Sequence, residues 1–161
     1  MQPAFDYKQF IVLCVDDEEA MLRSFKRAFG GKFRILAASS AEEGLTLLRQ
    51  HKDEVGVLIA DSWMPVHKGT WLLEQARDIK PHLVRIYWSC CGAHGDALLE
   101  ACRIGIHKFI MLPFDPATME QTLRGALEQF ALVDDLVPKG VACRPSGSNG
   151  VNKDMWNQCP A

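Results

Sequence analysis

Short apolar runs alternate with amphipathic helical patterns five times along this 161-residue chain. The runs lack polar alternation, which is typical of parallel strands buried on both faces. Parallel strands need crossover connections, and the intervening patterns have the spacing of one helix face. The alternation therefore predicts an α/β fold with a doubly wound, five-stranded parallel sheet in the order 2-1-3-4-5, flanked by five helices. The expected strands are residues 10–15, 33–38, 55–60, 84–88 and 107–111.

Local signals predict where several helices begin and end. Ser40 and Glu43 have the spacing of a capping box. Asp115 followed by Pro116 is typical of a helix start, with proline in the first turn. The Gly30-Gly31 pair indicates the end of the first helix.

The chain is predicted to contain one domain, residues 1–137, followed by a flexible tail, residues 138–161. In the tail, Gly, Ser, Asn and Pro dominate and the apolar periodicity ends. The six cysteines follow no regular framework, so we expect free thiols in a chain with a core of this size.

Charge and hydropathy exclude several classes of function. The net charge of −2 gives no electrostatic reason to expect binding to nucleic acid or to an anionic membrane. No apolar run has the length of a membrane span, and the N-terminus does not resemble a signal peptide. We therefore expect a cytoplasmic protein.

Acidic residues follow two strands that should be neighbours in the sheet. Asp16 and Asp17 follow the first strand, and Asp61 follows the third. Ligands of open α/β sheets bind at the carboxyl ends of the strands, where these carboxylates would meet. An all-oxygen site of this kind suits Mg²⁺. Singly, the acids also fit an ordinary helix N-terminus and a polar turn, but together they favour a functional site.

Four segments give the chain a resemblance to the receiver domain of bacterial response regulators, which has a flavodoxin-like fold. They are Val15-Asp16-Asp17-Glu18, Ile59-Ala60-Asp61-Ser62-Trp63-Met64-Pro65 with Gly69, Ser89 at the end of the fourth strand, and Leu112-Pro113-Phe114-Asp115 after the fifth. The resemblance covers residues 10–132.

The resemblance implies a role for each matching position. Asp61 would accept a phosphoryl group from a phosphohistidine, and Ser89 would bond the phosphoryl oxygen. Phe109 would be the switch aromatic, and Pro113 would hold the following loop, with a cis peptide bond as an option. The implied Mg²⁺ ligands are Asp16, Asp17, Asp61 and the backbone carbonyl of Trp63.

One position departs from the family pattern. The family has a lysine immediately before the loop proline, where this chain has Leu112. Leucine cannot form the charge-assisted bond that lysine forms with the acceptor and the phosphoryl group. Two readings stay open: a receiver that is phosphorylated with weak switching, and a pseudo-receiver that binds partners without phosphorylation.

The resemblance also implies protein partners. These are a histidine kinase or phosphotransfer protein and a downstream protein target, and the face formed by the fourth helix, fifth strand and fifth helix is a candidate for homodimer formation. A flavin- or nucleotide-binding enzyme of this architecture is disfavoured, because it would need a phosphate-binding loop where the chain has Asp16-Asp17-Glu18-Glu19.

Overall fold

The computed structural model describes residues 4–90 and 95–138, which form five strands and five helices in strict alternation. The tail predicted for residues 138–161 lies outside the described residues except for Pro138. The elements are β1 (Ile11–Val15), α1 (Glu19–Phe29), β2 (Arg34–Ala38), α2 (Ala41–Gln50), β3 (Val55–Asp61), α3 (Gly69–Ile79), β4 (Val84–Ser89), α4 (Gly95–Arg103), β5 (Lys108–Met111) and α5 (Pro116–Asp134).

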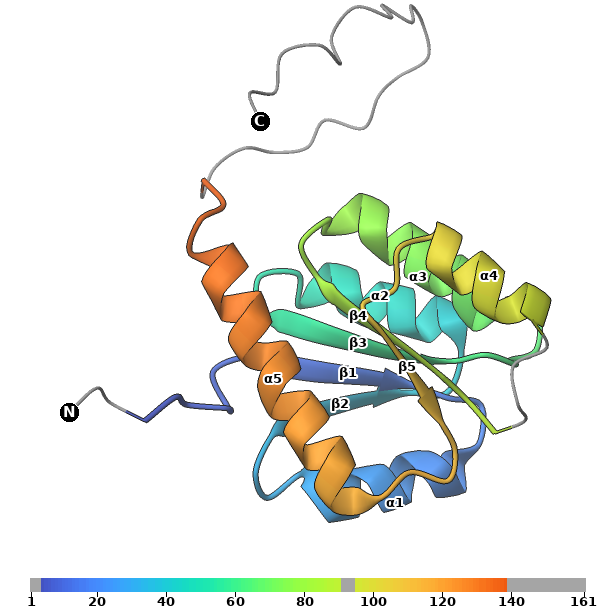
Figure 1. Ribbon diagram of the computed structural model, residues 1–161, viewed down its shortest axis with the longest axis horizontal. Coiled ribbons are helices and arrows are strands. Elements are labelled where there is room, and N and C mark those ends of the chain that lie inside the picture. The colour runs from blue at the N-terminus through green and yellow to red at the C-terminus, as the bar shows by residue number, and fades with distance from the viewer. Residues whose placement is uncertain (1–3, 91–94, 139–161) are drawn as a thin grey trace, which may run out of the picture.

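The sheet is parallel, with strand order β2-β1-β3-β4-β5, which confirms the predicted topology. The first strand, β1, lies inside the sheet. The chain then forms one edge with β2 and crosses back to build the other edge with β3, β4 and β5 (Figure 1). The reversal of winding direction lies between β1 and β3. In folds of this kind, the crevice outside the carboxyl ends of those strands is where ligands bind.

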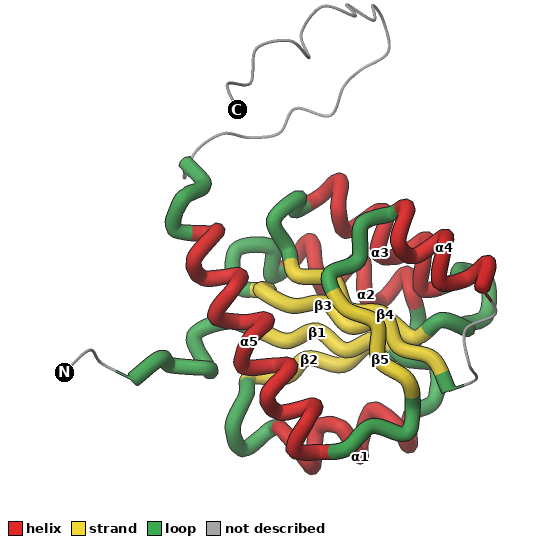
Figure 2. Tube along the Cα trace, viewed as in Figure 1, coloured by secondary structure: helices red, strands yellow, loops and turns green. Residues whose placement is uncertain are grey.

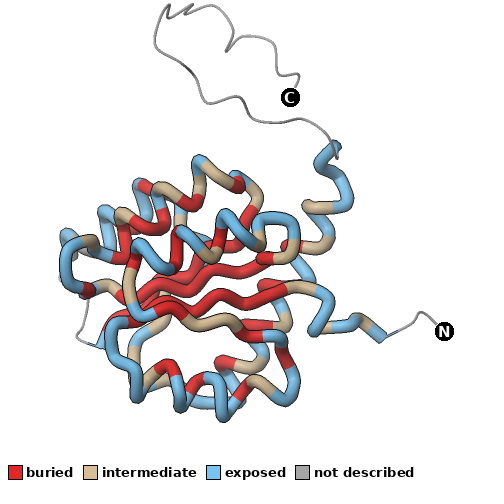
Figure 3. The backbone as a smooth tube through the Cα atoms, turned by 180° about the vertical axis from the view of Figure 1, so that it is seen from behind, coloured by how far each residue is buried: buried red, intermediate tan, exposed pale blue. Residues whose placement is uncertain are grey.

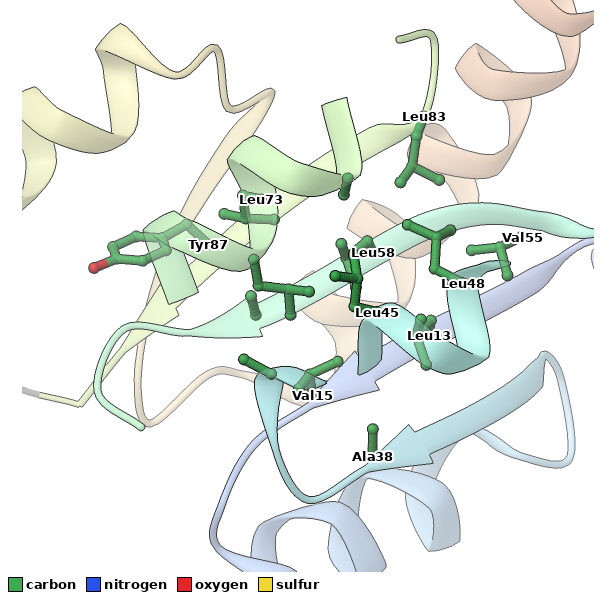
Figure 4. Close-up of a cluster of buried hydrophobic side chains, with 14 of the residues drawn as sticks. Leu13, Val15, Ala38, Leu45, Leu48, Val55, Leu58, Leu73, Leu83 and Tyr87 are labelled. Atoms are coloured by element: carbon green, nitrogen blue, oxygen red, sulfur yellow. The ribbon is translucent and has the colours of Figure 1, made fainter. Parts of the chain in front are cut away.

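Helices cover both faces of the sheet (Figures 1 and 2). Helices α2, α3 and α4 lie on one face, where their apolar side chains pack on residues such as Leu13, Leu58 and Tyr87 (Figure 4). Helices α1 and α5 lie on the other face and cover a second cluster that includes Phe25, Trp88 and Phe130. Two separate cores thus lie on either side of one sheet.

Burial of the central strands explains their continuous apolar sequences. Every residue of β1 and β3 is buried, and so is every residue of β4 (Figure 3). The edge strand β5 is only partly covered, with Lys108 and Met111 exposed. A strand covered by helices on both faces has no water-facing side, so the two-residue polar alternation disappears.

The predicted N-terminal caps of α5 and α2 are both present. In α2, the glutamate of the predicted capping box bonds a different backbone group from the one expected. The Asp115 carboxylate accepts a hydrogen bond of 2.8 Å from the backbone N–H of Thr118 and caps α5. Ser40 caps α2 by accepting from the backbone N–H of Glu43. The Glu43 carboxylate, however, accepts from the backbone N–H of Ser39, one residue before the cap, at 2.7 Å.

The expected free thiols are confirmed for two of the described cysteines. Cys14 is buried in β1 and Cys102 is exposed, both without a disulfide, and Cys90 is exposed after β4. The remaining three cysteines lie outside the described residues. No helix in the described ranges is both long enough and apolar enough to cross a lipid bilayer.

The first residue of α3 is in close contact with the end of β3. A Cβ atom added to Gly69 would lie 2.0 Å from the backbone carbonyl oxygen of Asp61, which is far inside van der Waals contact. Gly69 therefore allows α3 to begin directly against the strand that carries Asp61.

We expect Gly69→Ala to lower the free energy of unfolding by about 1–3 kcal/mol, because the new methyl group overpacks a backbone contact. Gly125→Ala is the matched control. It adds the same methyl group in α5, where nothing lies within 4 Å, and should stabilise the helix by up to about 1 kcal/mol. Urea unfolding of both variants measures the difference, and equal effects would contradict the contact.

Candidate functional site

The parallel pairing of β1 and β3 brings three carboxylates together. Asp16 follows the last residue of β1, and Asp61 is the last residue of β3. The register pairs Val15 with Ala60, so Asp16 and Asp61 are level with each other on adjacent strands. Carboxylate oxygens of Asp16, Asp17 and Asp61 all lie within 4.8 Å of one another. The predicted acidic cluster is therefore present.

The three carboxylates differ in their exposure to water. Asp16 and Asp61 are buried, whereas Asp17 is exposed at the rim. Burial raises the pKa of Asp61 to about 6, and the negative charge of Asp16 acts in the same direction. Burial is also the main cause that raises the pKa of Asp16. Like charges in a partly dry pocket disfavour the ionised form of each group.

Backbone donors orient the two buried carboxylates. The N–H of Glu18 donates to Oδ1 of Asp16 at 2.8 Å, and the N–H of Trp63 donates to Oδ2 of Asp61 at 3.1 Å. Both bonds lower the pKa of the carboxyl that accepts them, but less than burial raises it. No lysine or arginine of the described chain is among the main influences on either pKa.

This donor set fits a hard divalent cation. Three carboxylates with neighbouring oxygen atoms, one of them open to solvent, match the ligands and the retained waters that Mg²⁺ prefers. Without a cation, the repulsion between the carboxylates is relieved only by raised pKa values. The cluster is thus chemically suited to hold Mg²⁺ and to bring a phosphate group next to Asp61.

Leu112 provides no charge to this pocket. Its side chain is half-buried and packs with the cluster under α1 and α5, beside Phe114. Its backbone N–H donates to the carbonyl of Ser89 at 2.9 Å, which ties the loop after β5 to the end of β4. The Leu112–Pro113 peptide bond is cis, as the resemblance allowed.

Ser89 lies at the end of β4, buried and next to the acidic cluster along the strand ends. Its Oγ accepts a hydrogen bond of 2.9 Å from Oγ of Ser62, the residue that follows Asp61. Ser62 was not among the predicted site residues. The only sequence signal for it was its position next to Asp61, because nothing in a single sequence shows that two hydroxyl groups will meet.

The aromatic residue predicted to act as a switch lies beside the same strand. The Phe109 ring on β5 is half-buried and packs against the ring of Tyr87 on β4, with centroids 5.8 Å apart. Burial raises the pKa of Tyr87, and the nearby Ser62 hydroxyl acts in the opposite direction. Ser62 thus lies close to both Tyr87 and Ser89 of β4.

Trp63 lies at the surface. Its side chain is 73% exposed, and the Nζ atom of Lys68 lies 5.6 Å above the indole ring. Lys68, the nearest cation in the sequence after Asp61, thus lies over an exposed ring. Trp63 contacts the acidic cluster through its backbone, because its N–H donates a hydrogen bond to the Asp61 carboxylate.

Comparison with known proteins identifies the family. The family model for the response regulator receiver domain matches residues 12–124. The chain belongs to this family. It is a receiver, a signalling domain of two-component systems, and receivers of this kind interact with kinases and with downstream effectors.

Two curated relatives of this receiver are hydrogenase transcriptional regulatory proteins named HoxA. The protein from Cupriavidus necator is 33% identical over 129 residues, which are 80% of this chain and 26% of the relative. The protein from Bradyrhizobium diazoefficiens is 26% identical over 133 residues, which are 83% of this chain and 27% of the relative. The receiver thus spans about a quarter of the length of these relatives.

Solved structures show the same fold. A response regulator receiver domain protein from Clostridium thermocellum superposes with a TM-score of 0.72 at 26% identity, covering 77% of this chain and 98% of that one. The signal receiver domain of an HD domain-containing protein from Pseudomonas fluorescens gives a TM-score of 0.75 at 22% identity, covering 85% and 100%. The second similarity supports the fold alone.

The raised pKa of Asp61 predicts a pH-dependent stability in metal-free buffer. A carboxyl whose pKa is higher in the folded protein stabilises the fold when protonated, so this contribution is complete below the ordinary value of 3.8. It is lost as the pH rises to the folded value of about 6. Relative to Asp61→Asn, the wild type should lose about 2–3 kcal/mol between pH 4 and pH 7.

Urea unfolding of both proteins in the presence of EDTA, at several pH values, measures this difference. Titratable groups remote from the cluster are common to both proteins, so their contributions cancel in the comparison. Parallel pH profiles for wild type and Asp61→Asn would show that Asp61 has an ordinary pKa.

Proposed function

We propose that this receiver accepts a phosphoryl group on Asp61 from the phosphohistidine of a histidine kinase or phosphotransfer protein. The observation that carries the proposal is the cluster of three carboxylates at the carboxyl ends of β1 and β3. Asp61 is the one that ends the central strand β3, and its carboxylate is held by the Trp63 N–H. With a pKa of about 6, Asp61 is mostly ionised at neutral pH and can act as a nucleophile.

In the proposed step, a carboxylate oxygen of Asp61 attacks phosphorus. The bond from phosphorus to the histidine nitrogen breaks, and the electron pair returns to the imidazole, which then takes up a proton. Asp16, Asp17, Asp61 and the backbone carbonyl of Trp63 would hold Mg²⁺, which would supply positive charge against the repulsion between carboxylates and phosphate. The hydrogen bond from Glu18 keeps Asp16 oriented toward the same point.

Ser89 is proposed to report phosphorylation. Its hydroxyl moves to bond a phosphoryl oxygen, and this movement breaks the hydrogen bond that it accepts from Ser62. Phe109, which packs on Tyr87 beside Ser89, then changes its packing. The result is a shift between two conformations of the surface formed by α4, β5 and α5, hereafter the signalling face.

The signalling face is the proposed contact surface for a downstream protein target or for a second copy of the receiver. Its elements expose apolar side chains, among them Leu99 on α4 and Met111 on β5, each 57% exposed. Exposed apolar groups of this kind favour protein contact over binding to nucleic acid. A cytoplasmic location, where two-component phosphotransfer takes place, is part of the same proposal.

The second candidate is a pseudo-receiver that changes conformation on partner binding alone. Leu112 is the observation that favours it, because the loop after β5 brings no cation to the pocket. In that case the acidic cluster would hold a divalent cation without accepting a phosphoryl group.

Intact mass after incubation with Mg²⁺ and acetyl phosphate distinguishes the two candidates. We expect one phosphoryl adduct on the wild type, because Asp61 is ionised at neutral pH and lies next to the cation ligands. Asp61→Asn is the control and should carry no adduct. A wild type that binds Mg²⁺ and remains unmodified would favour the pseudo-receiver.

A lysine at position 112 should strengthen the coupling between phosphorylation and the signalling face. Its ammonium group would pair with the carboxylate and then with the phosphoryl oxygens. We expect phosphorylation of Leu112→Lys to change the hydrogen exchange of β5 and α5 amides more than phosphorylation of the wild type does. Leu112→Met, which is apolar, is the control. Equal changes in all three proteins would show that Leu112 does not weaken switching.

A further inference from the structure

The indole N–H of Trp88 is buried without a hydrogen-bond partner. Trp88 lies in β4 directly before Ser89, and its side chain is 0% exposed. Its Nε1 is the one buried side-chain polar atom in the described part of the chain that has no hydrogen bond. Leaving a buried donor unpaired is unfavourable, so each such group in a folded protein calls for an explanation.

The sheet register places Trp88 in one row with the two buried carboxylates. Asp61 and Trp88 are paired residues of β3 and β4, and Asp16 is level with Asp61 on the other side. Residues level with each other on neighbouring strands project to the same face of a sheet. Cys14, Ile59 and Ile86, two residues earlier in each strand, all belong to the core under α1 and α5. Trp88, Asp61 and Asp16 therefore project to this same face.

The indole ring is fixed by its packing. It contacts the Phe25 ring of α1 edge-on, with centroids 5.5 Å apart, and stacks on the Phe114 ring at 6.1 Å. The nitrogen consequently cannot turn toward water or toward another acceptor without disturbing two aromatic contacts. An N–H held in this way can form a hydrogen bond only if an acceptor moves toward it.

The acceptor within reach of this N–H is the carboxylate of Asp16. The Trp88 N–H is close enough to the Asp16 carboxylate to lower the pKa of Asp16, although the contact falls short of hydrogen-bond geometry. Oδ1 of Asp16 already accepts from Glu18, and a carboxylate has capacity for several more bonds. A small rotation of the carboxyl group would complete the bond to the indole and satisfy the buried donor.

We propose that Trp88 is a positioning residue that donates its indole N–H to Asp16 and holds this carboxylate as a ligand for a divalent cation. The inference rests on the metal site of the proposed function and adds to it a residue outside the ligand set. Carboxylates that bind metal ions are commonly oriented by a further donor of this kind. A neutral donor orients Asp16 without adding a positive charge, so the pocket keeps its full charge for the cation.

Two measurements on the whole chain, with Mg²⁺ alone as the probe, test the inference. In protein labelled with ¹⁵N at the tryptophan side chains, the Trp88 indole proton resonance should move downfield as Mg²⁺ binds. In Asp16→Asn this movement should be lost. Trp88→Phe identifies the resonance by its disappearance. If Trp88 only contributed to the stability of the core, adding Mg²⁺ would not shift its indole proton resonance.

Calorimetric titration of Mg²⁺ gives the second readout. Trp88→Phe keeps an aromatic ring but removes the N–H, and should weaken Mg²⁺ binding about tenfold. Phe130→Leu is the matched control, because it removes an aromatic ring from the same core and leaves the two rings that pack on the indole unchanged. Its Mg²⁺ affinity should remain close to that of the wild type.

The outcomes separate this inference from the proposed function. If Mg²⁺ binds the wild type but the indole resonance does not respond, or if both variants lose affinity equally, the role of Trp88 is overturned. If the resonance responds while acetyl phosphate leaves no adduct, phosphorylation fails and the role of Trp88 stands. If Mg²⁺ does not bind the wild type, the metal site and the role of Trp88 are both rejected.

Discussion

Electrostatic repulsion at the junction of β1 and β3 is the constraint on which the site depends. The parallel register fixes Asp16 and Asp61 side by side, and both are buried. Apolar packing on the two faces of the sheet supplies the free energy that keeps these like charges together. The carboxylates at this end of the sheet therefore repel each other in the folded protein, and binding of a divalent cation would reduce this repulsion.

The fold could be predicted from sequence because burial of a strand on both faces leaves a clear pattern. The runs in β1 and β3 are apolar throughout, and the structure buries every one of their residues. The predicted strand order is one of the common orders of doubly wound parallel sheets. The helix caps could also be predicted, except that the Glu43 carboxylate accepts from the backbone N–H of Ser39 and not from that of Ser40. The turn before the helix decides which of the two bonds forms. Such a choice depends on local geometry that residue types do not encode.

The candidate site was only partly predictable. Asp16, Asp17 and Asp61 could be found because strand ends of a parallel sheet converge. Ser62 and Trp88 could not, because their contacts depend on side-chain directions across neighbouring strands. In a sequence, Trp88 is one apolar residue of a buried strand, and only packing against Phe25 and Phe114 fixes where its nitrogen lies.

If Ser89 moves on phosphorylation as proposed, its hydrogen bond with Ser62 would oppose that movement in the resting receiver. A hydrogen bond of this kind contributes about 1 kcal/mol net, which corresponds to roughly a fivefold change in an equilibrium constant. Under the proposed function, a signal that moves Ser89 would first have to exceed this bias, which would act whether or not a kinase is present. Spontaneous activation would then be made rarer by Ser62, the residue next to the proposed acceptor Asp61. The level of output without a signal would depend on a single hydroxyl group.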